Sequence, residues 1–452
     1  MIKKLFLVVI LLSWAKSLCA SPLLPAETFT LKNGVQFILM QNKRAPIVSY
    51  STWYKVGSAD EIPKKTGLAH YLEHLMESGL PEVQMGQFLE DFQASGTHSN
   101  ASTAQDYTFY FKMVMTDHLE LLMQYEAGRM RGVAFNKDKF ETEKNVILEE
   151  RLMRTENEPI ELSNEKFNRQ FFTVHPYQNP IIGWENDIRN LTLEDIKAFH
   201  AKWYHPNNAF VIVSGDFEPA QVKAWAEKYY GSIPSGPKVI RSRSEEPLDQ
   251  SKLPPVILEH PRATEFSYSQ IYHLPELKQK KYTDLLALFL LSEFLDGDFE
   301  GSLYEILVHK KKLATSFNSQ CPFYSYLDPW SFVIYVSASS ESRMQEIETT
   351  INETLAHIAK VGLTPEDLKR ARKYLYNSII VSLDDIFQKA VFLGEALSSN
   401  LTLEQINALP SDLEKITSAD IQRVIATYLT KDKAAINILK KPSSPLSQEK
   451  EK

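Results

Sequence analysis

A polar, proline-rich segment divides this chain into two halves that share one order of expected elements. Residues 236–255 contain several prolines and a run of alternating arginine and serine followed by two glutamates, a composition typical of an interdomain linker. On each side of it, hydrophobic periodicity predicts a strand, a helix, a second strand and two more helices. At 452 residues the chain is also too long for one ordinary core. We therefore predict two homologous domains, 21–235 and 256–440, and a polar tail at 441–452.

The expected elements are those of an α+β fold. Short turns between several strands favour hairpins, so each domain should contain a largely antiparallel sheet packed with helices. In the first half we expect strands at 36–40, 48–56, 106–115 and 209–213, and helices around the histidine motif and at 85–93, 117–132, 137–157 and 219–230. In the second half we expect strands at 266–272 and 332–337, and helices at 282–295, 344–361 and 365–381.

The first 20 residues have the pattern of a secretory signal peptide. Two lysines precede an apolar run, and small residues lead to Ala20, after which we expect cleavage. A membrane anchor is less favoured because the apolar run is well short of the ~20 residues that span a bilayer. Lipid attachment at Cys19 is also less favoured, because Lys16 and Leu18 fit a lipidation box poorly. We expect an exported protein, periplasmic or secreted, without a stable membrane anchor.

Cysteine content and charge narrow the possible functions. The chain has only two cysteines, Cys19 in the expected leader and Cys321, so no disulfide framework is expected. The net charge is −7, and loss of the three leader lysines would take it to −10. This acidic balance makes nucleic acid an unfavourable partner.

The sequence His70-Tyr71-Leu72-Glu73-His74 carries the strongest chemical signal. On a helix, histidines at i and i+4 share one face, and Glu73 lies beside them. Neutral imidazoles bind zinc, and an adjacent carboxylate can take a proton from water at the metal. This order is the inverted H-x-x-E-H motif of zinc hydrolases. The alternative is a pair of exposed histidines on an amphipathic helix, but the apolar residues around the motif favour the metal site.

A catalytic zinc site generally has three protein ligands, so a third must come from another segment. The helix expected at 137–157 offers Glu143, Glu149 and Glu150. Glu143 and Glu150 are seven residues apart and share a helix face, whereas Glu149 points about 100° away from Glu150. The spacing favours Glu150 as the ligand and Glu143 as a carboxylate that orients a ligand. The alternative for all three is an ordinary solvated face.

Several segments in the first half are similar, in the same order, to motifs of the insulinase/pitrilysin family of zinc peptidases. The resemblance is strongest to short bacterial members and to the mitochondrial processing peptidase. The matching segments are 57–58, 67–76, 100–103, 106–108, 143–150, 175–177, 180–183, 204–209 and 215–217.

The resemblance implies a role for each matching residue. His70, His74 and Glu150 would hold one Zn²⁺ per chain, Glu73 would be the general base, and Glu143 would act from the outer shell. It also implies two homologous α+β domains that face each other across a chamber.

The resemblance further assigns Asn100 and Ala101 to an edge strand. There an extended peptide substrate would add as a further strand and be held by backbone hydrogen bonds. From its residue type alone, Asn100 could equally be a turn residue.

The second half departs from the family pattern. Self-sufficient members carry an Arg and a Tyr, seven residues apart, that bind substrate and stabilise the oxyanion. Val308 and Thr315 occupy these positions here, and neither can perform that role. His309 and the lysines at 310–312 could supply a shifted cation, or could form a solvated turn. Some bacterial members work as pairs in which one subunit supplies zinc and the other the Arg and Tyr.

We therefore expect the zinc-bearing subunit of an exported metalloendopeptidase that hydrolyses peptides or unfolded polypeptides, with a homologous subunit as its partner. The alternatives are a self-sufficient or homodimeric peptidase and a non-catalytic scaffold or binding subunit. The scaffold is less favoured because such subunits usually lose zinc ligands.

Overall fold

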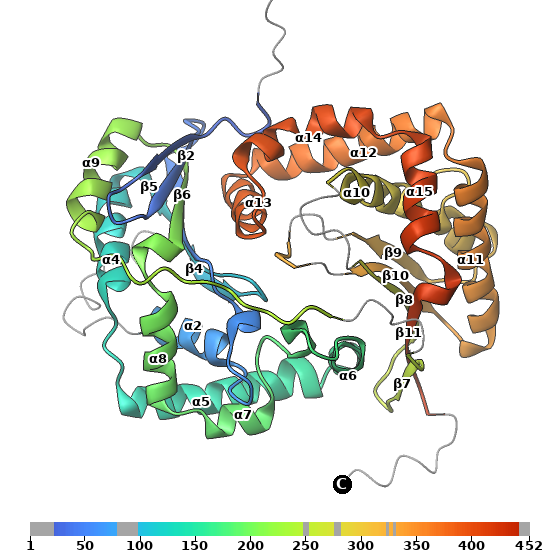
Figure 1. Ribbon diagram of the computed structural model, residues 1–452, viewed down its shortest axis with the longest axis horizontal. Coiled ribbons are helices and arrows are strands. Elements are labelled where there is room, and N and C mark those ends of the chain that lie inside the picture. The colour runs from blue at the N-terminus through green and yellow to red at the C-terminus, as the bar shows by residue number, and fades with distance from the viewer. Residues whose placement is uncertain are drawn as a thin grey trace, which may run out of the picture.

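The two halves of the chain each build one sheet with helices around it (Figure 1). The computed structural model describes residues 22–78, 98–246, 253–274, 282–321, 325–328 and 331–442. The expected leader at 1–20, the helix expected at 85–93 and most of the expected tail at 441–452 lie outside the described residues. Within the described ranges, no helix combines the length and apolar character needed to cross a membrane.

The sheet of the first half has six strands in the order β1-β2-β6-β3-β5-β4. The strands are β1 (Glu27–Thr30), β2 (Gln36–Gln41), β3 (Ile47–Tyr54), β4 (His98–Thr103), β5 (Thr108–Met115) and β6 (Ala209–Gly215). Neighbours are antiparallel except β2 and β6, which are parallel. Among the described residues, β4 pairs with β5 alone and forms one edge of the sheet.

The sheet of the second half has five strands in the order β7-β11-β8-β10-β9. The strands are β7 (Val256–Glu259), β8 (Phe266–His273), β9 (Ser316–Gln320), β10 (Ser331–Ala338) and β11 (Ala434–Lys440). Only β7 and β11 are parallel. The expected α+β class with two largely antiparallel sheets is confirmed. The exact domain boundaries and the chamber stay predictions.

Six helices of the first half share a core on one face of the six-stranded sheet: α2 (Leu68–Ser78), α4 (Leu119–Arg131), α5 (Lys137–Arg151), α7 (Glu185–Asn190), α8 (Leu193–Trp203) and α9 (Pro219–Tyr230). A further helix, α6 (Pro159–Phe171), packs elsewhere. Phe37 and Tyr50 of the sheet share a buried core with Leu72 of α2 and Leu122 of α4. The helix expected at 137–157 ends its α-helical part at Arg151 and continues as a π-helical turn, Leu152–Glu156.

Helices of the second half form most of the other core. They are α10 (Tyr282–Asp296), α11 (Met344–Val361), α12 (Pro365–Asp384), α13 (Ile386–Ser398), α14 (Leu403–Lys415) and α15 (Ser418–Tyr428). Leu291 of α10 and Ile351 of α11 are fully buried in one core with Ile334 and Val336 of β10.

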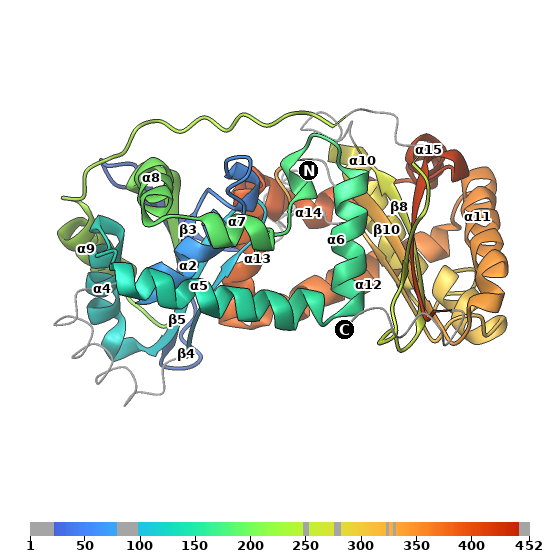
Figure 2. The same cartoon turned by 90° about the horizontal axis from the view of Figure 1, so that it is seen from below.

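Each half also lends one helix to the other half's sheet (Figures 1 and 2). α13 packs on β3 and β6, where Leu393 lies in one core with Trp53 and Phe210. α6 packs on β7 and β11, where Phe167 lies in one core with Val256. Both faces of each sheet are therefore covered, which explains why the central strand β6 is buried along its whole length.

Candidate metal centre

The helix α2 is held at its first turn by a glycine contact and a carboxylate cap. Gly67 has φ +88°, and a Cβ there would lie 2.7 Å from the carbonyl oxygen of Ile182. Gly183 packs closely against Gly67 in turn, because a Cβ added at Gly183 would lie 2.6 Å from Gly67 Cα. Glu61 accepts hydrogen bonds of 2.9 and 2.8 Å from the N–H groups of Gly67 and Ala69. A carboxylate at this end satisfies free N–H groups and complements the helix dipole.

His70 and His74 project from one face of α2 towards Glu150 of α5. The Nε2 atoms of His70 and His74 lie 3.6 and 3.4 Å from Glu150 Oε2. One ligand atom from each of the three residues lies within 4.8 Å of the others. The side chains are only 12, 21 and 18% exposed. The structure thus brings together the three residues that the sequence suggested as ligands, although 76 positions separate His74 from Glu150.

This donor set fits zinc. Bonds of about 2.0–2.2 Å in a tetrahedral site place neighbouring ligand atoms about 3.3–3.5 Å apart, close to the two separations from Glu150. Two imidazoles and one carboxylate form a set that zinc accepts, with one position left for water or substrate. Burial and the neighbouring His74 lower the pKa of His70 to about 4, so this ring is neutral, as a ligand must be, at pH 7. The other oxygen of Glu150 lies 3.0 Å from Arg154.

Glu143 orients one of the two imidazoles. Its Oε2 lies 3.2 Å from His74 Nδ1. Because a carboxylate only accepts, Nδ1 carries the proton in this contact, and Nε2 faces Glu150. Burial lowers the pKa of His74, but its hydrogen bonds with Glu150 and Glu143 outweigh burial and leave the pKa raised. Glu149 is exposed, on the solvent side of α5. Glu143 and Glu150 therefore share the face that turns towards α2.

Glu73 lies beside the three donors and is bonded to the edge strand. Thr103 of β4 donates a hydrogen bond of 2.5 Å to Glu73 Oε2. Burial raises the pKa of Glu73 to about 7, while the Thr103 hydrogen bond opposes that rise. A carboxyl group with a pKa near neutrality is suited to take up and release a proton.

The edge strand β4 carries Asn100 and Ala101. Asn100 is exposed and its side chain accepts a hydrogen bond of 2.9 Å from the Ala101 N–H. Their position on an edge agrees with the expectation, and their binding role stays a prediction. The sequence did not predict the contact of Thr103 with Glu73. The one available signal was that Thr103 lies in the matched segment 100–103 and shares Ala101's side of the strand.

Val308 and Thr315 lie in the second half, on either side of the segment 309–314. Val308 is part of a π-helical segment, Glu305–Lys310, and packs against the core of that half. Thr315 is exposed, and its hydroxyl donates a hydrogen bond of 3.3 Å to Glu265. Lys310 pairs with Glu305 at 3.0 Å.

Comparison with known proteins identifies the family. A family model described as Insulinase (Peptidase family M16) matches residues 36–185, and one described as Peptidase M16 inactive domain matches residues 190–375. All four residues of the cluster, His70, Glu73, His74 and Glu150, lie within the first match.

Relatives of nearly the same length share both halves of the chain. The chain is 28% identical over 450 residues to the zinc protease PqqE of Helicobacter pylori, covering 96% of this chain and 97% of that protein. It is 24% identical over 399 residues to the uncharacterized zinc protease YmxG of Bacillus subtilis, with 88% of this chain and 93% of that protein covered.

Solved structures show the same fold. The crystal structure of a protease from Helicobacter pylori superposes with a TM-score of 0.81 at 28% identity, over 93% of this chain and all of that chain. The first half of the periplasmic protease PqqL from Escherichia coli superposes with a TM-score of 0.75 at 19% identity, covering 92% of each chain. With its two domains and its inverted zinc motif, the chain belongs to the insulinase/pitrilysin (M16) peptidase family.

Proposed function

We propose that this protein is an exported, zinc-dependent metalloendopeptidase. The observation that carries the proposal is the convergence of His70, His74 and Glu150 on one point, with the buried carboxyl of Glu73 beside them. The names of the relatives as zinc proteases support it.

The residues of the site divide the reaction between them. His70, His74 and Glu150 would hold zinc, which when bound lowers the pKa of water and polarises a peptide carbonyl. Glu73 would accept the proton of the attacking water and return it to the leaving amine, so that the carboxylate is regenerated after each cycle. Thr103 would hold Glu73 in place, and Glu143 would keep His74 in the tautomer whose Nε2 binds the metal.

Extended peptides or unfolded polypeptides are the proposed substrates. Strand addition to an edge needs a chain whose backbone donors and acceptors are free, and β4 offers such an edge beside Glu73. A folded protein does not expose its backbone in this way.

We further propose a periplasmic or secreted location and a homologous partner subunit. The leader pattern at 1–20 and the periplasmic location of the structurally similar PqqL support export. The partner would supply the Arg and Tyr that are absent at Val308 and Thr315. A self-sufficient homodimer and a non-catalytic subunit are the alternatives, and the match of 190–375 to an inactive domain leaves the latter open.

Zinc content and cleavage of a quenched peptide by the purified chain test the proposal, with Glu73→Gln as the key variant. Wild type should bind one zinc and cleave, whereas the variant should keep zinc and lose about 10²–10⁴-fold in rate. No zinc in wild type, or full activity in the variant, would refute the enzyme assignment. Adding a homologous subunit that carries Arg and Tyr should raise the rate, and a rate that no such subunit raises would refute the pairing.

A further inference from the structure

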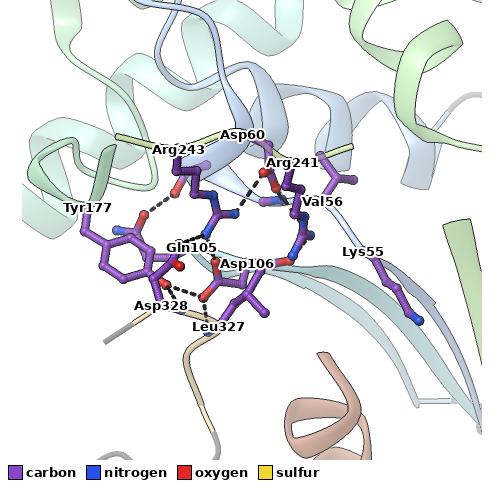
Figure 3. Close-up of polar contacts among 12 residues, drawn as sticks. Lys55, Val56, Asp60, Gln105, Asp106, Tyr177, Arg241, Arg243, Leu327 and Asp328 are labelled. Carbon is purple, nitrogen blue, oxygen red and sulfur yellow. Dashed lines mark hydrogen bonds and ion pairs between the residues drawn. The ribbon is translucent and has the colours of Figure 1, made fainter. Parts of the chain in front are cut away.

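One linker arginine lies at the centre of a buried ionic cluster between the two domains (Figure 3). Arg243 contacts carboxylates from three separate segments: Asp60 at 2.8 Å, Asp328 at 2.9 Å and Asp106 at still shorter range. The side chains of Arg243, Asp60 and Asp106 are 7, 2 and 0% exposed, and that of Asp328 is 14% exposed. Asp60 and Asp106 belong to the first domain, and Asp328 belongs to the second.

Hydrogen bonds close the cluster across the domain junction. The Tyr177 hydroxyl donates to Asp106 at 2.6 Å and accepts from the N–H of Asp328 at 3.1 Å. The N–H of Leu327 also donates to Asp106, at 2.8 Å. Arg241 donates to the Asp106 carbonyl oxygen at 2.6 Å and lies 3.3 Å from Asp60. Figure 3 shows these groups pointing towards one another from the linker and both domains.

The charges of the cluster depend on Arg243. Burial raises the pKa of Asp60, although Arg241 and Arg243 oppose that rise. Burial also acts to raise the pKa of Asp328, but His175 and Arg243 outweigh burial and hold that pKa well below its usual value. Without Arg243, Asp60 would keep Arg241 at 3.3 Å and Asp328 would keep His175 at 3.3 Å, but the Asp106 carboxylate would lose its ion pair. A buried charge that loses its partner is strongly unfavourable.

Two short paths lead from the cluster to the candidate metal centre. Asp60 precedes Glu61, which caps the first turn of α2 next to His70. Asp106 lies three residues after Thr103, the hydrogen-bond donor to Glu73.

The two loops on these paths are themselves joined. Ser58 and Ala59 donate backbone hydrogen bonds of 3.0 and 2.9 Å to the carbonyl oxygens of Ala104 and Gln105. A Cβ at Gly57 would lie only 2.3 Å from the Ala104 oxygen, so the loops touch closely. A displacement of either Asp60 or Asp106 is therefore transmitted to both.

We infer that Arg243 is a positioning residue. It couples the second domain, through Asp328, to the loops that hold helix α2 and Glu73. The coupling concerns the geometry of those loops, and only its effect on rate rests on the proposed peptidase function. Zinc ligation and proton transfer remain with the residues named above.

Hydrogen–deuterium exchange of the full chain tests the coupling independently of activity. The variants are Arg243→Gln and Asp328→Asn, the second removing only the charge that the other domain contributes. The control is Arg423→Gln, because Arg423 pairs with Asp284 and Asp420 inside the second domain. The same samples are used to measure the unfolding temperature and, by chelator competition, the zinc affinity. The kcat and KM are measured at a temperature well below the unfolding temperature.

Both cluster variants should exchange at least about tenfold faster in peptides covering 57–78 and 98–108. We expect an accompanying fall in kcat of about tenfold, at one zinc per chain and with KM little changed. Arg423→Gln should lower the unfolding temperature and leave those peptides unchanged.

Two results would overturn the coupling: unchanged exchange in both segments of a folded cluster variant, or the same acceleration in the control. If Arg243→Gln does not fold, the isosteric Asp328→Asn decides by the same criteria. An inactive wild type would refute the peptidase proposal, while the exchange result would still decide the coupling.

Discussion

The hydroxyl of Thr103 donates a 2.5 Å hydrogen bond to the carboxylate of Glu73, and this contact links the edge strand to the candidate base. The hydrogen bond lowers the pKa of Glu73 against the effect of burial. Thr103→Val should therefore raise that pKa and move the acidic limb of the pH–rate profile to higher pH, because a general base must be ionised. A hydrogen bond to a charged group contributes about 1.5–3 kcal/mol, so the loss at acidic pH should be on the order of tenfold.

The plateau at alkaline pH should change much less, since Glu73 is ionised there in both proteins. Thr103→Ser keeps the hydroxyl and is the matched control, with a limb near that of wild type. A valine variant whose acidic limb coincides with that of wild type would show that the contact does not tune Glu73.

Neighbouring glutamates of α5 give a matched pair for metal binding. Glu150 lies 3.4 Å from His74 Nε2, whereas Glu149 is exposed on the same helix. Glu150→Gln should abolish stoichiometric zinc binding in calorimetry, and Glu149→Gln should bind zinc as wild type does. Equal affinities in the two variants would place the third ligand elsewhere.

Glu143 is expected to act on zinc through His74. Glu143→Ala removes the oxygen that accepts from His74 Nδ1, and loss of such an outer partner typically lowers metal affinity 10–100-fold. Chelator competition should show a drop of this size, smaller than that of Glu150→Gln. An unaltered affinity would mean that the contact does not orient the ring.

A carboxyl group in α10 should make stability depend on pH. Burial, with the nearby charge of Asp296, raises the pKa of Glu293 to about 7. Below about pH 4.5 the carboxyl group is neutral in both the folded and the unfolded chain, so it does not lower the free energy of unfolding. As pH rises towards 7 the unfolded chain ionises first, and the folded state loses stability until the pH passes the folded pKa.

Glu293→Gln should therefore stabilise the protein at pH 8 by about 1–3 kcal/mol and have little effect at pH 4.5. Denaturant titrations at the two pH values measure the difference. A gain that is the same at both would rule out ionisation as its cause.

Gly394 of α13 allows the second half to pack on the first. A Cβ there would lie 2.2 Å from Trp53 Cε2. Gly394→Ala should destabilise the fold by about 1–3 kcal/mol, as expected for overpacking of a core. Gly128 in α4 is the control, because a Cβ at that position meets nothing within 4 Å. Gly128→Ala should be neutral or stabilising, by up to about 1 kcal/mol, and equal losses in both variants would contradict the packing argument.

Local periodicity predicted most of the regular elements correctly. Expected strands at 36–40 and 266–272 correspond to β2 and β8, and expected helices at 219–230 and 344–361 coincide with α9 and α11. It did not predict β1, β4, β7, β9 and β11, or the helices α6, α7, α8, α13, α14 and α15. The missed strands are short or lie at sheet edges, apart from β11, and α6 and α13 belong in space to the other half's sheet.

The sequence by itself determined the relations within single helices. His70 and His74 share one face of their helix. On the helix at 137–157, Glu143 and Glu150 share a face, and Glu149 does not. A helix has about 3.6 residues per turn, so such spacing needs no tertiary information. Tertiary structure alone decided that α5 lies against α2 and that Thr103 reaches Glu73. It also decided that α13 and α6 cross between the halves, and that Arg243 joins both domains to the site. Approaches of this kind depend on how the whole core packs, and no local pattern records them.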